Sequence, residues 1–181
     1  MKISILLPYK ENFSPNYAGA VSLFVRDTTL QSTYKKDITI YGNTYYKKKL
    51  LSSYVNLKIN KKFFQSGSKI YVDKFLKEEA KMNSDLIEVH NRPNYIKSLY
   101  GKSESKLVLY FHNDPLTMNG SKSIKDRMFL LKNTNKIIFN SNWSKDRFFV
   151  NFTKINSHIH KIAVVYQSAK KPKVNIKKKE K

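Results

Sequence analysis

The chain has 181 residues, enough for one domain with its own core, and it contains no cysteine, which excludes disulfides, thiolate metal sites and cysteine nucleophiles. Its 35 lysines and arginines outnumber its 13 aspartates and glutamates and give a formal net charge of +22. No apolar run approaches the ~20 residues of a membrane span, and the apolar start of the chain is too short for a signal peptide, so we expect a cytoplasmic protein.

The positive charge comes mainly from lysine, since Arg26, Arg92, Arg127 and Arg147 are the only arginines. A surplus of this size is typical of proteins that bind nucleic acid, an anionic membrane surface or an anionic substrate. An AT-rich genome, which favours lysine, asparagine and isoleucine, would produce the same surplus without any function. Specific readers of nucleic acid favour arginine, whose planar fork pairs with bases, so we expect no specific nucleic acid partner.

Short apolar runs alternate with longer amphipathic stretches along the chain. In chain order, we predict a strand at 2–8, a helix at 17–36, strands at 37–42 and 54–59, a helix at 69–82, a strand at 85–90, a helix at 92–101, a strand at 106–112, a helix at 121–133, a strand at 135–141, a helix at 142–151 and a strand at 161–167. The strands are apolar along nearly their whole length, which predicts a Rossmann-like three-layer α/β/α domain with a mostly parallel sheet.

The predicted domain extends over residues 1–167, and a segment of different composition follows it. This segment, residues 168–181, is rich in lysine and has no apolar face. It is either a disordered basic tail or a linker toward a further domain, and the sequence leaves both interpretations open.

Polar residues cluster directly after several predicted strands, where parallel sheets bind their ligands. Two of these loops contain a His-Asn pair, and they contribute His90, Asn91, Arg92, His112, Asn113 and Asp114. Imidazole and amide groups hydrogen-bond hydroxyls, and a carboxylate accepts from them. A single histidine at a strand end is usually a capped surface residue, but two such pairs at one edge of a sheet favour a ligand site.

The first helix opens on a run of small residues, Ala18, Gly19 and Ala20. Small residues let a ligand approach the backbone, and the unpaired N–H groups of a helix start suit a diphosphate. The loop has neither the dinucleotide-binding glycine pattern nor a P-loop, so close strand–helix packing explains it equally well. Ser141 stands at the start of the last predicted helix, where a serine is most simply an N-cap.

Residues 45–65 mix lysines with tyrosines and phenylalanines. Such a segment suits an anionic membrane surface or single-stranded nucleic acid, and it also fits a solvated loop whose aromatic rings fold inward. His158 and His160 have the H-x-H spacing of a metal site, but no carboxylate or cysteine partner is evident, and we expect no metal.

The order of these motifs resembles the amino-terminal domain of family 4 glycosyltransferases, which are retaining enzymes with the GT-B fold. The segments that carry the resemblance are SPNYAGAVSLFV (14–25), DLIEVHNRPNYI (85–96), LVLYFHNDP (107–115), KIIFNSNWSKDRF (136–148) and KIAVVYQSAKKP (161–172). These segments are distributed from residue 14 to residue 172, so the resemblance extends over nearly the whole chain. The last segment resembles the crossover that leads into the second domain of these enzymes.

The resemblance implies a nucleotide-sugar donor, a saccharide or lipid-linked acceptor, and no metal or other cofactor. It implies that Gly19 approaches the donor phosphate and that His112 contacts the donor sugar and orients a hydroxyl. The residues it implies for the acceptor side and the cleft are His90, Asn91, Arg92, Asn113, Asp114 and Ser141. In such retaining enzymes the leaving diphosphate is thought to take the acceptor proton, so no catalytic carboxylate is required here.

The resemblance further implies a hexosyltransferase of cell-surface polysaccharide or lipopolysaccharide synthesis, peripheral on the inner face of the plasma membrane. The family usually has paired glycines in its first loop, and here Ala18 precedes Gly19. The family's basic pair and glutamate pair, which hold the donor, lie in a carboxy-terminal domain, so we expect this chain alone to be inactive. The alternative function is a basic module that binds nucleic acid or an anionic surface without catalysis.

Overall fold

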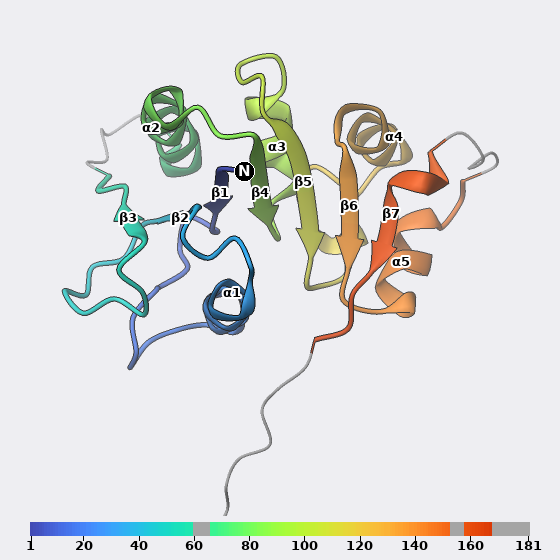
Figure 1. Cartoon of the computed structure of the whole chain (residues 1–181). Helices are drawn as coiled ribbons and strands as arrows, with labels where there is room; N and C mark the ends of the chain where they lie inside the picture. Colours follow the sequence, from blue (N-terminus) through green and yellow to red (C-terminus); the bar gives the residue numbers. More distant parts are fainter. Residues whose placement is uncertain (60–65, 153–157, 168–181) are drawn as a thin grey trace, which may run out of the picture.

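A single parallel sheet organises the chain. The structure, a computed structural model, describes residues 1–59, 66–152 and 158–167, so the predicted basic segment 168–181 lies outside the described residues. Seven strands form the sheet in the order β3-β2-β1-β4-β5-β6-β7, and each neighbouring pair runs parallel (Figure 1). The predicted Rossmann-like α/β domain with a parallel sheet is confirmed.

All the predicted helices and strands are present, most of them with shorter bounds, while the helix predicted at 69–82 begins two residues earlier, at Gly67. The elements are β1 (Ile3–Leu6), α1 (Ala20–Gln31), β2 (Ile38–Gly42), β3 (Tyr54–Asn56), α2 (Gly67–Met82), β4 (Leu86–His90), α3 (Pro93–Leu99), β5 (Lys106–Phe111), η1 (Pro115–Thr117), α4 (Ile124–Asn133), β6 (Lys136–Phe139), α5 (Asn142–Phe149), η2 (Ile159–Lys161) and β7 (Ile162–Val164). The sequence did not predict η1 and η2, because a single 3₁₀ turn is too short to leave a periodic pattern.

The first helix differs most from its predicted bounds, because the residues before it form a turn. Tyr17 donates its backbone N–H to the Ser14 carbonyl, and Gly19 is the N-cap with extended backbone at φ −78° and ψ 173°. The helix itself begins only at Ala20. The small-residue run therefore lies at the start of α1, with Ala18 and Gly19 before the helix and Ala20 as its first residue.

The two faces of the sheet carry different helices. Val21 and Val25 of α1 pack against Ile5, Ile38 and Ile40 on one face. The helices α2 to α5 pack on the other face, over a larger apolar cluster (Figure 1). Because successive side chains of a strand point to opposite faces, one strand supplies both clusters.

The sheet contains a switch point beside β1. Strands β2 and β3 lie on one side of β1, and β4 to β7 continue on the other. Sheets of this kind bind ligands outside the carboxyl ends of their strands, where the strand order reverses. The loops after β1, β4 and β5 lie at this edge of the sheet, around the switch point.

Candidate functional site

The two His-Asn loops lie side by side at the carboxyl edge of the sheet. His90 is the last residue of β4 and pairs with Tyr110 in the register of β4 and β5. His112 stands just after β5 and two residues beyond Tyr110, so its side chain shares a face with those of Tyr110 and His90. This is the face that α1 covers, and Phe24 of α1 packs edge-on against His112 at 5.0 Å between ring centroids.

A continuous chain of polar contacts runs through both histidines. His90 Nε2 lies 2.5 Å from Glu88 Oε1, and His90 Nδ1 lies 2.8 Å from His112 Nε2. His112 Nδ1 lies 2.6 Å from the amide nitrogen of Gln167, in the segment after β7. His90 is fully buried, with its ring stacked on Tyr110. Its ring nitrogens thus serve neighbouring side chains, and His112 is the histidine nearer to solvent.

The polar chain fixes which nitrogen of each ring carries a proton. The amide nitrogen of Gln167 can only donate, so His112 carries its proton on Nε2, and His90 in turn carries its proton on the Nε2 that faces Glu88. His90 Nδ1 is then an acceptor, and His112 Nε2 carries the proton between the two rings. His112 Nδ1 remains the acceptor, to which Gln167 donates. A ligand that replaces Gln167 must therefore donate a hydrogen bond, as a hydroxyl does.

His112 is held in its neutral form. Burial, and to a smaller degree the neighbouring His90, lowers the pKa of the His112 imidazole from 6.5 to about 3. Desolvation disfavours the charged form of any imidazole, and a second cation nearby disfavours it further. A neutral imidazole with one nitrogen as acceptor suits the orientation of a hydroxyl and does not act as a general acid near pH 7.

Asn91 joins the two loops. Its side-chain oxygen accepts the backbone N–H of His112 at 3.2 Å, and its backbone N–H donates to the Tyr110 carbonyl at 2.8 Å. Its backbone φ is 54°, a left-handed conformation that asparagine adopts more readily than most residues. Arg92 follows as the N-cap residue of α3 and donates from Nη1 to the Asn91 carbonyl at 2.7 Å.

A polar pocket of about 450 Å³ opens beside Asn91 and Arg92. It is lined by Ser68, residues 91–94, residues 117–119 and Lys122. Sequence analysis identified Asn91 and Arg92 and missed the other lining residues, which come from the start of α2, the start of α3 and the loop around η1. The polar run from Thr117 to Lys122 was the only signal, and it matches no motif.

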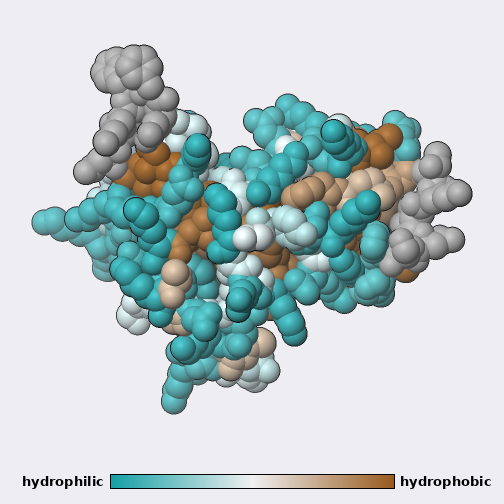
Figure 2. All heavy atoms as spheres, turned by 90° about the horizontal axis from the view of Figure 1, so that it is seen from above, coloured by the Kyte–Doolittle hydropathy of each residue, from teal (hydrophilic) through white to brown (hydrophobic). Residues whose placement is uncertain are grey.

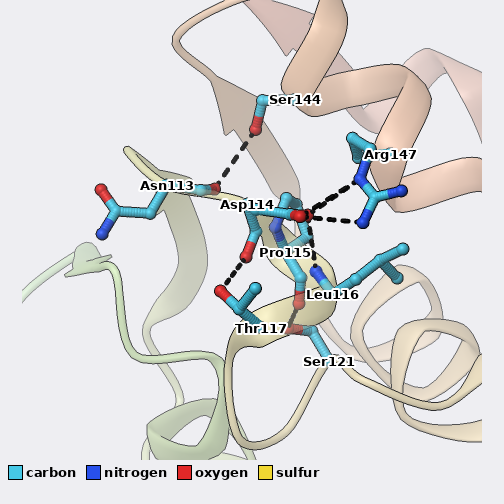
Figure 3. Close-up of polar contacts among 8 residues, drawn as sticks. All are labelled: Asn113, Asp114, Pro115, Leu116, Thr117, Ser121, Ser144 and Arg147. Atoms are coloured by element: carbon cyan, nitrogen blue, oxygen red, sulfur yellow. Dashed lines mark hydrogen bonds and ion pairs between the residues drawn. The ribbon is translucent and has the colours of Figure 1, made fainter.

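Asp114 is tied to α5 rather than open to a ligand (Figure 3). Arg147 donates to both carboxylate oxygens, with its Nη2 at 2.9 Å from Asp114 Oδ2, and Leu116 donates its backbone N–H to Oδ1 at 3.0 Å. Burial acts to raise the pKa of the Asp114 carboxyl, but the bonds from Arg147 and Leu116 hold it below its ordinary value. The acceptor role of Asp114 stays a prediction, and its observed contacts support the η1 turn.

Asn113 and Ser141 also have structural partners. Ser144 donates from Oγ to the Asn113 carbonyl at 3.4 Å, while the exposed Asn113 amide points away from the Asp114–Arg147 pair (Figure 3). Ser141 Oγ accepts the backbone N–H of Ser144 at 3.1 Å and caps α5, which confirms its interpretation as an N-cap. Their binding roles stay predictions.

Glu11 occupies the start of α1, where a diphosphate was expected. Its Oε1 accepts the backbone N–H of Ser22 at 3.1 Å, and a side chain at Gly19 would collide with this carboxylate. Gly19 is therefore required for the close approach of Glu11. Ala18 is half-buried and Ala20 is exposed, so neither residue is enclosed by the core at the start of α1. Sequence analysis missed Glu11, which has no motif around it.

The loops after β1 and β2 expose aromatic rings. Tyr45 is 85% exposed, and Tyr17 stacks on Tyr46 with ring centroids 4.0 Å apart. Tyr45 also lines a pocket of about 270 Å³ with Lys10 and other loop residues. The interpretation of residues 45–65 as a loop with its aromatic rings folded inward is thus wrong for Tyr45. Residues 60–65 of this segment lie outside the described part of the chain.

The described surface is otherwise mainly polar. In the view of Figure 2, hydrophilic residues cover most of the visible face, and hydrophobic residues show in patches between them. None of the helices in the described ranges is long and apolar enough to cross a membrane. Within the same ranges, no group of three histidine and acidic side chains is placed to hold a metal ion.

The neutral state of His112 leads to a test by pH. An imidazole whose pKa is lower in the folded chain than in the unfolded chain opposes folding once the unfolded form is protonated. We expect the free energy of unfolding to fall as pH drops from about 6.5 toward 3, and to fall less in His112→Gln. Urea denaturation at several pH values measures this, with His158→Gln as the control. Titration of the His112 ring near pH 6.5 in NMR spectra of the folded chain would contradict the assignment.

The Asp114–Arg147 pair is tested by a double-mutant cycle. Because the pair is bidentate and partly buried, we expect Asp114→Asn and Arg147→Gln to couple by about 1 kcal/mol in urea denaturation. Asp146→Asn, which removes a longer and more exposed pair with Lys145, is the matched control and should change stability by less than about 0.5 kcal/mol. Strict additivity of the two changes would show that the pair is not a structural tie.

Comparison with known proteins shows which of them share this fold. No family model and no curated protein matches the sequence. The lipopolysaccharide outer core galactosyltransferase WaaB in its apo form is similar in structure, with a TM-score of 0.63, 13% identity, and coverage of 93% of this chain and 46% of that chain. Sucrose-phosphate synthase from Thermosynechococcus elongatus has a TM-score of 0.61 and 10% identity, and the match covers 92% of this chain and 48% of that chain. Anabaena HepE in complex with UDP has a TM-score of 0.56 and 14% identity, and the match covers 92% of this chain and 44% of that chain.

This chain thus spans less than half the length of these three enzymes, at 44% to 48%. Identities of 10% to 14% establish a common fold and no more. The similarity extends over nearly all of this chain, and these three neighbours are GT-B glycosyltransferases, while a UDP-N-acetylglucosamine 2-epimerase is similar as well, with a TM-score of 0.52, 10% identity, and coverage of 90% of this chain and 47% of that chain. The chain has the fold of one half of a GT-B glycosyltransferase, as its motifs implied.

Proposed function

We propose that this chain is the acceptor-side domain of a retaining hexosyltransferase. Its substrates would be a nucleotide-sugar donor and a saccharide or lipid-linked acceptor of cell-surface polysaccharide synthesis. The observation that carries the proposal is His112, placed at the carboxyl end of a central strand and held neutral with Nδ1 as its acceptor. The match to solved glycosyltransferases supports the class of enzyme, and the motif order supports the retaining family.

His112 would orient a sugar hydroxyl in this reaction. The hydroxyl would donate to Nδ1 and take the place of the Gln167 amide. The exchange of one hydrogen bond for another costs little free energy, so the position is readily available to a substrate. The fixed tautomer would select a hydrogen-bond donor at that point and hold the sugar in one orientation for transfer.

The carboxylates of this edge support a mechanism without a general base from this domain. Glu88 accepts from His90, Asp114 pairs with Arg147, and Glu11 caps α1. Each already has a partner, and none of the three is free to take a proton from an acceptor. The acceptor proton would therefore go to the leaving diphosphate, as the family resemblance implies.

The donor would need a second domain. At the start of α1, a donor diphosphate and the Glu11 carboxylate would compete for the same N–H groups. A cationic donor site elsewhere would have to hold the diphosphate, and the family places that site in the other half of the GT-B fold. We therefore propose that this chain alone does not transfer sugar.

A second candidate function is docking on an anionic membrane surface. The exposed Tyr45 and the stacked pair of Tyr17 and Tyr46 lie next to Lys47 and Lys48, which are also exposed. Aromatic rings that meet a headgroup layer beside lysines are typical of peripheral membrane contacts. This function would combine with transfer to a lipid-linked acceptor at the inner face of the plasma membrane.

The role of His112 is tested in the complete enzyme that contains this domain. Because His112→Ala removes the acceptor of the hydroxyl, we expect kcat/KM to fall at least tenfold, which corresponds to about 1.4 kcal/mol. His160→Ala, a change at an exposed histidine, is the control and should keep the rate. An unchanged rate in His112→Ala would remove this residue from the site. Turnover of a nucleotide-sugar by the 181-residue chain alone would contradict its expected inactivity.

Membrane docking is tested by co-sedimentation with liposomes. Each lysine near an anionic surface contributes about 1 kcal/mol, so we expect the double change Lys47→Gln and Lys48→Gln to weaken binding to anionic liposomes at least tenfold. A matched double change at the exposed Lys35 and Lys36 removes the same charge elsewhere and should have a small effect. Equal binding of the unchanged chain to anionic and neutral liposomes would reject docking by charge.

A further inference from the structure

The polar pocket beside β4 has a charge that no part of the mechanism above explains. The pocket lies where the start of α2, the start of α3 and the loop around η1 meet. Its lining contains two cations, Arg92 and Lys122, and no carboxylate. Its volume of about 450 Å³ is in the range of small-molecule sites.

Arg92 differs from the other arginines in its surroundings. Arg26 pairs with Asp27, and Arg147 pairs with Asp114. Arg127 is buried and donates to the carbonyls of Phe148, in the last turn of α5, and of Val150. Arg92 forms no ion pair within the described residues. It donates from Nη1 to the Asn91 carbonyl and contacts the Tyr95 hydroxyl, which leaves the rest of its fork for a ligand.

Asn91, a buried residue, supplies an unpartnered donor at the same place. The residue is 6% exposed, and its side-chain oxygen already accepts from His112. Its amide nitrogen has no hydrogen-bond partner among the described residues. Among the described residues, the polar side-chain atoms that are closed off from solvent and have no partner belong to Ser22 and Thr29. The unpartnered Asn91 nitrogen is not one of these atoms, so it is accessible from open space. The open space that Asn91 lines is the pocket.

Backbone geometry brings the two cationic loops together. Gly120 has a φ of 95°, and a Cβ at this position would lie 2.5 Å from the backbone nitrogen of Asn94. Only glycine permits this close approach in this conformation. The loop that contains Lys122 is thereby held against the start of α3, and Asn91 on the other side keeps its left-handed conformation. Two unusual backbone positions therefore flank the pocket.

The donors of the pocket fit a phosphate better than a neutral sugar. Arg92 offers a fork, Lys122 a point charge and Asn91 an N–H, and the first turn of α2 at Ser68 adds the positive end of a helix dipole. A phosphate accepts on all its oxygens and is charged at neutral pH, so it satisfies each of these groups. A neutral sugar would leave both cations without a counter-charge.

We propose that this pocket binds a phosphate group carried by the acceptor substrate. That the ligand is the acceptor rests on the proposed function, whereas phosphate binding does not. Asn91 connects the pocket to His112, because it lines the pocket and its side-chain oxygen accepts from the backbone of His112. An acceptor held here by its phosphate would lie next to the sugar that His112 orients. The phosphate belongs either to a sugar phosphate or to a lipid-linked sugar diphosphate.

The test is calorimetric titration of the chain at physiological salt with three ligands, glucose 1-phosphate, geranyl diphosphate and glucose. We expect at least one of the two phosphate compounds to bind and glucose to bind at least tenfold more weakly. Arg92→Gln and Lys122→Gln should each weaken phosphate binding at least fivefold. Lys122 is exposed, so its change leaves the fold intact even if Arg92→Gln disturbs α3. The stronger of the two phosphate ligands identifies the source.

The control is Lys36→Gln, which removes one charge at an exposed position far along the chain from the pocket. If Lys36→Gln weakens binding as much as Lys122→Gln, the net charge and not the pocket binds phosphate, and the proposal is overturned. Equal affinity for glucose and glucose 1-phosphate, or binding of neither phosphate compound, would overturn it as well. Failure of the pocket alone leaves transfer by the complete enzyme intact, while failure of the proposed function leaves phosphate binding intact.

Discussion

The contact between His90 and His112 depends on the register of two parallel strands. Because β4 and β5 place His90 opposite Tyr110, the ring of His112 reaches His90 Nδ1 at 2.8 Å. A slip by one residue would turn Glu88 and His90 to the other face and break the polar chain. The burial of Phe111 and its neighbours on the far face holds this register, so the apolar core determines the protonation of the site.

Two sites of different charge lie at the carboxyl edge of the sheet. At His112 the protein removes charge, because burial lowers the pKa of the imidazole and leaves an acceptor for a hydroxyl. At the pocket beside it, Arg92 and Lys122 concentrate charge and have no acidic partner in the described part of the chain. Asn91 lies between the two and keeps them a fixed distance apart. In a chain with a net charge of +22, such local differences decide where an anion binds.

The sequence predicted what depends on local pattern. Apolar runs gave the strands, their alternation with helices gave the parallel sheet, and the serine before a helix gave the Ser141 cap. It did not predict the partners of the site, because these depend on register and packing between distant segments. Glu88 lay unnoticed in an apolar strand, and Arg147 meets Asp114 across 33 positions. The pocket joins three separate loops, so no single stretch of sequence contains its pattern.

In this structure the protein's own side chains occupy two positions where substrates would bind. Gln167 donates to His112 Nδ1, and Glu11 accepts from the start of α1. A hydroxyl replaces an amide at His112 without a change of charge, so this exchange is nearly balanced. A diphosphate at α1 must displace a carboxylate, and the repulsion between the two anions opposes its entry unless Glu11 moves away. The pocket with Arg92 and Lys122 has no such occupant among the described side chains, and a phosphate therefore enters it without displacing a charge.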